Sequence, residues 1–281
     1  MENGKVYLVP TPIGNLKDIT LRALEVLENA DEIAAEDTRQ SLKLLNHFNI
    51  KKPLFSYHQH NENGRSDEII EKAMSGKIIA IVSDAGTPGI SDPGSVVVRK
   101  CIEKNIPFEV LPGANAVTTA LVYSGLDTTK FMFRGFIPRE TKDKKILIEE
   151  IKDSKETLIF YESPHRLIET LAYLKESLGN REIAVCRELT KLHEEIYRGT
   201  IEEAYNRFLE NRARGEFVLV LSGKTESEIQ AEKEEFFSSI TIEEQLVQLI
   251  NSGISKKDAI KIIAKERDLP KKDVYKIAID I

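Results

Sequence analysis

Three short segments of the sequence combine glycine, proline and small polar residues in a way suited to holding a ligand. They are Pro10–Leu16, Ser83–Gly94 and Leu111–Ala116. Each follows a short apolar run that is typical of a buried strand. Glycine lets the backbone approach a bound molecule closely, so that main-chain groups can contact it. Any one segment could be an ordinary turn, but three such loops after three strands predict one shared crevice, because long loops in compact domains tend to be functional.

The elements that would position these loops are apolar runs that alternate with segments of helical spacing. Strands are expected at Val6–Val9, Glu32–Ala35, Ile78–Val82, Phe108–Leu111 and Phe131–Phe133. Helices are expected at Thr20–Glu28, Ser41–Phe48, Ser66–Met74, Ser95–Glu103 and Val117–Ser124. This alternation predicts an α/β domain with a largely parallel sheet. The loops would then meet beyond the carboxyl ends of its strands, where open α/β sheets bind ligands.

The rest of the chain predicts three further parts. Expected strands follow one another more closely after residue 142, which predicts a second α/β domain of mixed sheet. We place the first domain at 1–115 and the second at 116–223. Residues 225–244 hold seven acids and one lysine, which indicates an acidic, solvated linker at 224–241. Residues 242–281 predict a small three-helix unit of helix-turn-helix type. Its eight basic and four acidic side chains over 254–276 form either a solvated face or an accessory RNA contact.

Composition and motifs exclude several classes of protein. The formal net charge is −6, so a nucleic-acid partner would need local basic patches rather than a basic overall field. No G-x-G-x-x-G follows the first strand, and Val218 stands where a Walker A loop ending at Ser222–Thr225 would need glycine. Cys101 and Cys186 are expected to be buried, reduced thiols. The histidines show no metal-ligand spacing, so no metal site is expected. The sequence shows neither a signal peptide nor an apolar span, which predicts a cytoplasmic protein.

Seven motifs, in matching order over residues 5–223, resemble the ribosomal-RNA branch of the tetrapyrrole-methylase superfamily. They are Tyr7–Leu16, Ala35–Arg39, Ser83–Gly94, Leu111–Asn115, Arg134–Arg139, Tyr161–Arg166 and Cys186–Lys191. The resemblance implies a two-domain α/β tetrapyrrole-methylase fold, with the three-helix unit as a variable C-terminal extension. It also implies a homodimer that uses S-adenosyl-L-methionine for 2′-O-methylation of a cytidine in the decoding centre of 16S rRNA. The expected partner is 16S rRNA within the 30S subunit, and whether naked rRNA suffices as substrate does not follow from the sequence.

Carried over by motif, the cofactor-binding residues fall in both domains. They are Ile13, Gly14, Ser83, Asp84, Ala85, Gly86, Thr87, Asn115, Ala116, Glu162 and Leu189. The second loop reads Asp-Ala-Gly-Thr-Pro where tetrapyrrole enzymes have Gly-Asp-Pro, which favours the RNA branch. We expect Gly14→Trp to abolish cofactor binding and to leave the fold intact.

Acids and arginines within the same motifs supply candidates for catalysis and for RNA contact. A ribose hydroxyl is a poor nucleophile, so a general base would help. The candidates are Glu36, Asp37, Glu162 and Glu188. Asp37 with Arg39 is equally well read as a structural ion pair, and Glu188 as a helix cap or salt bridge. The expected RNA contacts are Arg39, Arg134, Arg139, Arg166, Arg187 and Lys191, because such side chains bind phosphate.

Two rival functions remain open from the sequence. The first is a methyltransferase for a small tetrapyrrole, which would share the cofactor and the fold. The second is a non-catalytic RNA-binding protein, which would not bind S-adenosylmethionine. The nucleotide that accepts the methyl group and the identity of the base do not follow from the sequence.

Overall fold

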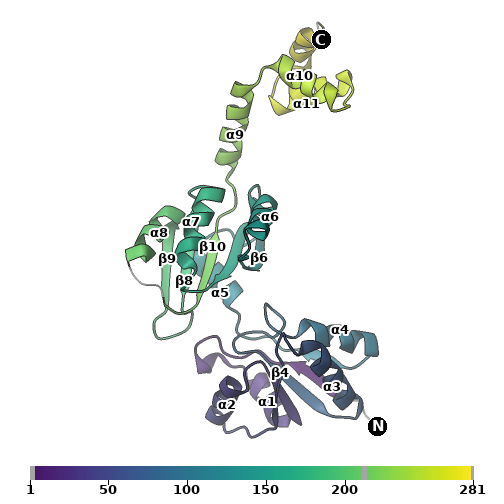
Figure 1. Ribbon diagram of the computed structural model, residues 1–281, viewed down its shortest axis with the longest axis vertical. Helices are drawn as coiled ribbons and strands as arrows, with labels where there is room; N and C mark the ends of the chain where they lie inside the picture. The colour runs from purple at the N-terminus through teal and green to yellow at the C-terminus, as the bar shows by residue number, and fades with distance from the viewer. Residues whose placement is uncertain (1–3, 211–213, 280–281) are drawn as a thin grey trace. The chain divides into compact units, whose positions relative to one another are not determined.

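The computed structural model describes residues 4–210 and 214–279. By its contacts the chain divides into two compact units, Met1–Gly223 and Lys224–Ile281 (Figure 1). The first unit contains both β-sheets and the second is helical. No helix of the described residues is both long enough and apolar enough to cross a membrane.

The first sheet is parallel throughout and has the strand order β3-β2-β4-β1-β5. Its strands are β1 (Lys5–Leu8), β2 (Glu32–Ala35), β3 (Leu54–Ser56), β4 (Ile78–Val82) and β5 (Phe108–Val110). The associated helices are α1 (Leu21–Asn29), α2 (Thr38–His47), α3 (Glu62–Met74) and α4 (Ser95–Lys104), with a short 3-10 turn η1 (Leu16–Asp18). Apolar clusters lie on both faces, one with α1 and α2 and the other with α3 and α4. This double cover explains why the central strand β4 is apolar along its whole length.

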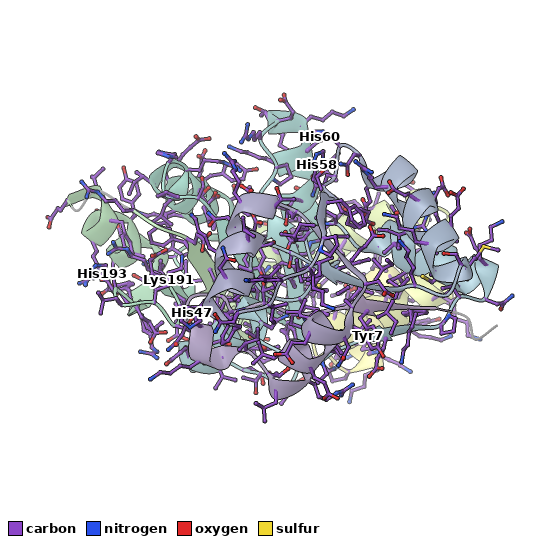
Figure 2. The ribbon with its side chains drawn as sticks, turned by 90° about the horizontal axis from the view of Figure 1, so that it is seen from below. Tyr7, His47, His58, His60, Lys191 and His193 are labelled. Carbon is purple, nitrogen blue, oxygen red and sulfur yellow. The ribbon has the colours of Figure 1, made fainter. Side chains whose placement is uncertain are left out.

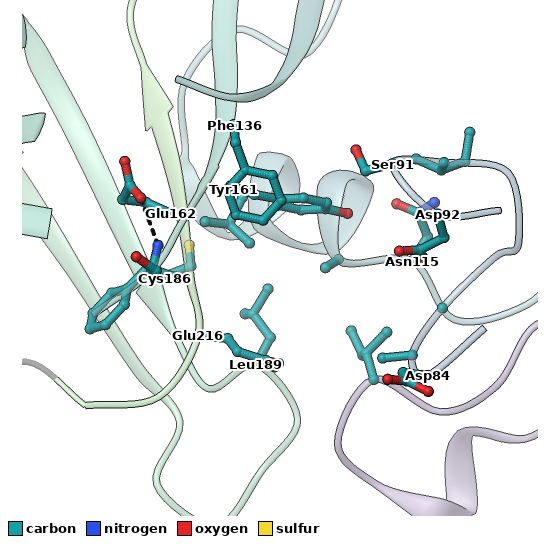
Figure 3. A pocket seen from close by; sticks show the side chains of 18 of the residues that line it. Asp84, Ser91, Asp92, Asn115, Phe136, Tyr161, Glu162, Cys186, Leu189 and Glu216 are labelled. Carbon is teal, nitrogen blue, oxygen red and sulfur yellow. Dashed lines mark hydrogen bonds between the residues drawn. The ribbon is translucent and has the colours of Figure 1, made fainter. Parts of the chain in front are cut away.

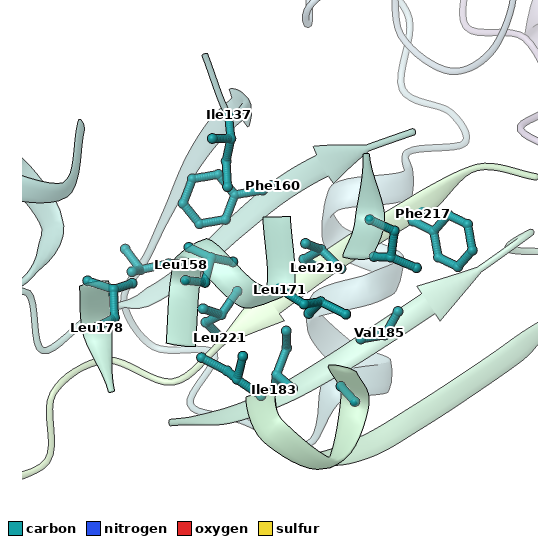
Figure 4. Close-up of a cluster of buried hydrophobic side chains, with 14 of the residues drawn as sticks. Ile137, Leu158, Phe160, Leu171, Leu178, Ile183, Val185, Phe217, Leu219 and Leu221 are labelled. Carbon is teal, nitrogen blue, oxygen red and sulfur yellow. The ribbon is translucent and has the colours of Figure 1, made fainter. Parts of the chain in front are cut away.

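The second sheet is mixed, as predicted, with the order β6-β7-β10-β8-β9. Its strands are β6 (Phe131–Phe136), β7 (Thr157–Glu162), β8 (Glu182–Arg187), β9 (Glu195–Thr200) and β10 (Phe217–Leu221). Only β6 and β7 pair in parallel, and the other pairs are antiparallel. Helix α5 (Ala116–Ser124) packs against one face. The helices α6 (Thr141–Ile151), α7 (Leu167–Leu178) and α8 (Ile201–Glu210) cover the other face, where the larger core lies (Figure 4).

Most expected elements of the first unit are confirmed, with three differences. The strand expected at Phe131–Phe133 belongs to the second sheet, where β6 pairs with β7. Strand β3 and helix α6 were not predicted, since β3 has only three residues and α6 begins in a run of charged residues. All strands of the first sheet precede residue 115 and all of the second follow 116, and both sheets lie in one compact unit. The division into two domains at 115/116 stays a prediction.

The second unit holds the three predicted C-terminal helices and one more. The three are α10 (Ile242–Asn251), α11 (Lys256–Glu266) and α12 (Lys271–Ala278), which enclose a small apolar core. Ser255 caps α11 by accepting a hydrogen bond from the Asp258 N–H. The acidic segment is itself largely helical, because Thr225 forms a capping box with Glu228 that starts α9 (Glu226–Ser239). The interpretation of 224–241 as a linker between domains stays a prediction.

Candidate functional site

The three loops predicted to form a crevice are joined to one another by direct contacts. Thr11 and Gly86 exchange two main-chain hydrogen bonds of 2.9 Å, which link the first loop to the second. The Thr11 hydroxyl also donates to the Ser83 carbonyl at 3.1 Å. The third loop lies against the first, since a Cβ atom added at Gly113 would be 2.5 Å from Cβ of Pro10. The close approach therefore requires glycine at that position.

These loops form one wall of a cavity of about 360 Å³ whose other wall comes from the second sheet (Figure 3). This donor cavity, as we call it below, is within the range of small-molecule sites. It is lined by Ile13, Glu36, Asp84, Ala85, Gly86, Thr87, Ile90, Ser91, Asp92, Asn115, Ala116, Phe136, Tyr161, Glu162, Ser163, Pro164, Cys186, Leu189, Glu216, Phe217 and Val218. The predicted crevice thus exists, and side chains from both sheets close it.

The structure brings most of the residues predicted to bind the cofactor into this cavity. Ile13, the run Asp84–Thr87, the pair Asn115 and Ala116, Glu162 and Leu189 all line it. Asn115 also caps α5 by accepting hydrogen bonds from the Val117 and Thr118 N–H groups, and this fixes the third loop at the cavity wall.

Gly14 and Ser83 are not among the lining residues, and each holds the loops in place. Ser83 is buried below the second loop, where its hydroxyl donates to the Gly86 carbonyl at 3.3 Å. A Cβ atom at Gly14 would lie 2.4 Å from Cγ of Lys191 and 2.7 Å from the Leu189 carbonyl oxygen. A side chain there must displace the Leu189–Lys191 segment, and the expectation that Gly14→Trp leaves the fold intact stays a prediction.

The lining carries a concentrated negative charge. Five of its residues are carboxylic acids, Glu36, Asp84, Asp92, Glu162 and Glu216, and among the described lining residues none is Lys, Arg or His. Burial raises the pKa of the Glu36 and Asp84 carboxyls. Burial and the charges of Glu36 and Asp84 raise the pKa of Asp92 to about 7. Such a cavity favours a cationic ligand and disfavours phosphate.

Glu162, predicted both as a cofactor contact and as a possible base, is held by several hydrogen bonds. Its side chain has no solvent exposure. It accepts from the Thr170 hydroxyl at 2.6 Å and from the Ser163 N–H at 2.8 Å, and Nε of Arg166 lies 3.8 Å from it. These partners connect the end of β7 to the start of α7. The arrangement stabilises this end of the sheet, where the cavity wall is built.

The other three candidate bases divide between the cavity and its surroundings. Glu36 lines the cavity and accepts a hydrogen bond of 3.4 Å from the Asp84 N–H. Asp37 is not among the lining residues; it caps α2 and pairs with Arg39, which agrees with the ion-pair interpretation. Glu188 also lies outside the lining and pairs with Lys191 at 2.9 Å, which agrees with the salt-bridge alternative.

The sequence did not predict eleven of the lining residues. Three of them lie in the loop after β4, and the others lie on the strands of the second sheet or next to them. The eleven are Ile90, Ser91, Asp92, Phe136, Tyr161, Ser163, Pro164, Cys186, Glu216, Phe217 and Val218. Asp92 could have been predicted from the sequence, because it belongs to the Ser83–Gly94 loop. Phe136 and Tyr161 form an aromatic pair with ring centroids 5.6 Å apart. Nothing in the sequence indicates that the start of β10 reaches the cavity, since that follows from strand pairing.

The predicted RNA contacts are mostly occupied by partners within the protein. Arg134 pairs with Glu150. Arg187 pairs with Glu195, and Lys191 with Glu188 and Glu216. Arg166 donates to the Ile137 and Pro138 carbonyls at 2.7 and 3.3 Å, which ties α7 to the end of β6.

Two of the predicted RNA contacts remain well placed for an external anion. The side chain of Arg39 is 88% exposed, although it pairs with Asp37. Arg139 is exposed and has no ion pair among the described residues. These two guanidinium groups can reach phosphate without breaking a contact that supports the fold.

The histidines do not assemble into one group. His58 and His60 have ring centroids 5.9 Å apart, whereas His47 and His193 lie well away from them in Figure 2, which also marks Lys191. Both cysteines are free and buried, as expected. Cys186 lines the donor cavity, and burial raises the pKa of its thiol to about 12, so it contributes an apolar wall and not a thiolate.

Comparison with known sequences gives a consistent result. The sequence profile of the Tetrapyrrole (Corrin/Porphyrin) Methylases matches residues 5–205. "Ribosomal RNA small subunit methyltransferase I" of Halalkalibacterium halodurans is 48% identical over 277 residues, which cover 98% of this chain and 95% of that protein. The protein of the same name from Bacillus subtilis is 49% identical over 97% of this chain and 93% of its own length.

A third relative of that name, from Thermotoga maritima, is 46% identical over 79% of this chain and 99% of its own length. That share of the chain equals the share made up by the unit Met1–Gly223.

Solved structures show the same fold at low identity. Diphthine synthase superposes with a TM-score of 0.65 and 16% identity, over 79% of this chain and 91% of that chain. Uroporphyrin-III-C-methyltransferase from Thermus thermophilus gives a TM-score of 0.54 and 23% identity, over 78% and 92%. In both cases the share of this chain that superposes is close to the share made up by the two-sheet unit, Met1–Gly223.

Proposed function

This chain belongs to the tetrapyrrole methylase family, and from that premise we propose that it methylates the 2′-hydroxyl of a cytidine in the decoding centre of 16S rRNA. It is a methyltransferase, and S-adenosylmethionine is the methyl donor. The RNA substrate is supported by relatives at 44–49% identity whose shared name is ribosomal RNA small subunit methyltransferase I. The proposal concerns which RNA atom receives the methyl group.

The structural observation that supports the methyl-transfer part of the proposal is the charge of the donor cavity. S-adenosylmethionine supplies an electrophilic methyl group on a positively charged sulfonium. The five carboxylic acids of the lining, with no described basic residue among them, suit a cationic donor. Ile13, Leu189 and Val218 add apolar surface, and the glycine-containing loops expose main-chain N–H and C=O groups. The residues present therefore fit the donor.

We assign the donor's contacts to the residues proposed above from the motifs. Ile13, Asp84–Thr87, Asn115, Ala116 and Leu189 would touch it directly, because they line the cavity. Gly14, Ser83 and Glu162 would act by holding the loops and β7 in position, since their contacts are within the protein. Bringing the hydroxyl into line with the methyl carbon would provide much of the rate enhancement.

RNA would approach from outside the cavity, since its phosphates are repelled by the acidic lining. Arg39 and Arg139 are the leading contacts among the six proposed, because both are exposed. Arg134, Arg166, Arg187 and Lys191 would contribute only where RNA replaces an existing partner. The basic face of α11 and α12 is proposed as an accessory contact. This substrate places the enzyme in the cytoplasm, acting on rRNA assembled in the 30S subunit.

A homodimer is also proposed. It is supported by large apolar side chains that are exposed on neighbouring elements. Val122 on α5 is 74% exposed and Leu192 is 94% exposed. The hydrogen bond between the Tyr123 hydroxyl and Glu194 joins these two segments. Light scattering of the purified protein tests the dimer, and a monomer at micromolar concentration would contradict it.

Labelled S-adenosylmethionine tests the function directly. We expect the protein to transfer label to 30S subunits, and mass mapping of the rRNA to place it on a cytidine ribose. Naked 16S rRNA is the comparison substrate. Label on a precorrin and not on RNA would overturn the proposal in favour of tetrapyrrole methylation. Absence of donor binding by calorimetry would overturn it in favour of a non-catalytic RNA-binding protein.

A further inference from the structure

The position of the second loop, Ser83–Gly94, depends on a residue that lies outside the donor cavity. The last part of this loop, Ile90–Asp92, lines the cavity, and Figure 3 shows Ser91 and Asp92 across the cavity from Glu162. This part belongs to no helix or strand and leads directly into α4. Contacts from elsewhere in the chain therefore have to fix it at the cavity wall.

Helix α4 begins without a cap of its own. The first N–H groups of a helix have no acceptor within the helix. The N-cap residue of α4 is Gly94, which has no side chain to accept from them, and the first turn of α4 holds no acidic residue. A partner from another element is needed to hold the end of the loop and the start of this helix.

Glu62, the first residue of α3, is that partner. Its Oε1 accepts hydrogen bonds from the Gly94 N–H at 2.9 Å and from the Val96 N–H at 3.4 Å. A carboxylate at the N-terminus of a helix is also stabilised by the helix dipole. Glu62 is not among the residues that line the cavity, so it can act on a bound donor only through the loop.

The carboxyl group of Glu62 is itself held in place. The Tyr57 hydroxyl donates to the same oxygen at 3.3 Å and lies 3.1 Å from Oγ of Ser66. Both of these residues are buried. Burial raises the pKa of the Tyr57 hydroxyl, which therefore keeps its proton and remains a donor to Glu62. The atom that accepts from the start of α4 thus has a defined position.

The connection between β3 and α3 ties this arrangement to the first sheet. Nδ2 of Asn61 donates to the Ser56 carbonyl at 3.3 Å, which links the start of α3 to the end of β3. Nε2 of Gln59 donates to the Ser91 carbonyl at 3.4 Å. The connection therefore contacts the second loop twice, once within the part that lines the cavity and once where α4 begins.

The loop needs this support because its own conformation is unfavourable. Ser91 has a φ of 62°, a left-handed conformation that is uncommon for serine. Gly94 has a φ of 149°, and a Cβ atom there would lie 2.9 Å from the Gly89 nitrogen, so the turn closes tightly on itself. Strained backbone persists only where the surrounding structure holds it. We expect the loop to leave the cavity wall for part of the time when its support is removed.

We propose that Glu62 is a positioning residue for the methyl donor, and this inference rests on the proposed function. By capping α4 from α3, Glu62 keeps Ile90–Asp92 at the wall where S-adenosylmethionine binds. Without this cap the loop would hold the binding conformation for only a fraction of the time, and the apparent affinity for the donor would fall by that fraction. The chemical step would change little, because a bound donor selects the same loop conformation.

The test compares two measurements on the full chain, well below the melting temperature of each variant. We expect Glu62→Ala to weaken S-adenosylmethionine binding, measured by calorimetry, by about tenfold or more. Its single-turnover rate of methylation of 30S subunits at saturating donor should stay within about threefold of wild type. Glu62→Gln keeps one oxygen that can accept from the Gly94 N–H, so its donor affinity should stay within about threefold of wild type.

Two controls separate this role from a general loosening of the fold. Asp67 forms a second link between α3 and α4, an ion pair with Lys100 at 2.6 Å, and Asp67→Asn should leave donor affinity unchanged. Tyr57→Phe removes a buried hydroxyl and leaves the cap on α4 in place. It should lower the melting temperature and keep donor affinity within about threefold of wild type.

Two outcomes would overturn the proposal: donor affinity of Glu62→Ala within about threefold of wild type, or an equal loss of affinity in Asp67→Asn. If Glu62→Ala does not fold, Glu62→Asp replaces it, because the shorter side chain withdraws its oxygens from the Gly94 N–H. Wild-type affinity in that variant would overturn the proposal equally. Calorimetry needs no RNA, so a wild type that binds the donor but labels no rRNA would overturn the proposed function and leave the role of Glu62 in donor binding intact.

Discussion

The two sheets contribute differently to the same cavity. The first sheet supplies loops whose acids, Glu36, Asp84 and Asp92, accept only main-chain N–H groups or nothing among the described residues. The second sheet supplies Glu162, whose oxygens accept from the Thr170 hydroxyl and the Ser163 N–H, and Glu216, whose Oε2 pairs with Lys191. The difference indicates that the carboxylates of the first sheet are less constrained by side-chain partners than Glu162, which fixes the wall from the second sheet.

The cause is the direction of the strands. In the parallel first sheet every loop after a strand emerges at the same edge, so several irregular segments meet there. In the mixed second sheet, antiparallel neighbours bring strand residues such as Val218 and Cys186 to the cavity with their side chains already packed. The four predictions below test this division, beginning with the largest expected effect.

Removing the Glu162 carboxylate should cause the greatest loss of stability. Glu162→Ala leaves the Thr170 hydroxyl and the Ser163 N–H without their acceptor and Arg166 without a counter-charge. We expect a fall of about 3–5 kcal/mol in the free energy of unfolding, measured with urea in the absence of ligand. Glu162→Gln keeps one acceptor oxygen and should lose less. A fall below about 1 kcal/mol for the alanine variant would show that the wall is not fixed by this residue.

A side chain at Gly14 should separate the loops of the two sheets. Because a Cβ atom there already overlaps the Leu189–Lys191 segment, Gly14→Trp should weaken S-adenosylmethionine binding about 100-fold, or about 2.8 kcal/mol, and lower the melting temperature. Calorimetry and thermal unfolding measure the two effects. Gly64→Trp is the matched control, since no atom lies within 4 Å of a Cβ added at Gly64. Unchanged affinity in Gly14→Trp would place the donor elsewhere.

The raised pKa of Asp92 predicts a pH-dependent effect on stability. Between about pH 4 and pH 7 the folded protein holds the Asp92 proton more tightly than the unfolded chain does, so this group lowers stability as the pH rises. Asp92→Asn removes the effect. Allowing for solvent screening of a partly exposed group, we expect the variant to gain about 1–2 kcal/mol relative to wild type between pH 5 and pH 8.

Urea unfolding at the two pH values measures this gain, with Asp67→Asn as the control at an exposed site. An equal effect of pH on wild type and Asp92→Asn would show that Asp92 is not destabilised by the cavity.

The smallest effect on stability is expected at Arg39, outside both walls. Its ion pair with Asp37 is exposed, so Arg39→Ala should leave the free energy of unfolding almost unchanged. Binding of 30S subunits should weaken about three- to tenfold, and more at low salt, because a phosphate contact is lost. Arg99→Ala, an exposed arginine on α4, is the control. An equal effect of the two variants would remove Arg39 from the RNA contacts.

The order of strands and loops could be predicted because it follows from local periodicity. The apolar run of β4 and the glycines after it already indicated a buried strand and a ligand loop. The pairing of strands far apart in sequence could not be predicted in this way. Phe131–Phe133 shows this, since the same apolar run could join either sheet until its pairing with Thr157–Ile159 is known.

The sequence by itself determined the fold class, the three loops and the family, because these depend on residue types and spacings along the chain. Only the tertiary structure decided which carboxylates are free. Glu162 and Asp92 both lie in motifs and both line one cavity. The Glu162 carboxylate accepts a hydrogen bond from Thr170 and lies near Arg166, whereas the Asp92 carboxylate has no hydrogen-bond or ion-pair partner among the described residues. The reason is that basicity depends on neighbours in space, and the neighbours of Asp92 arrive from β2, from β4 and from β7.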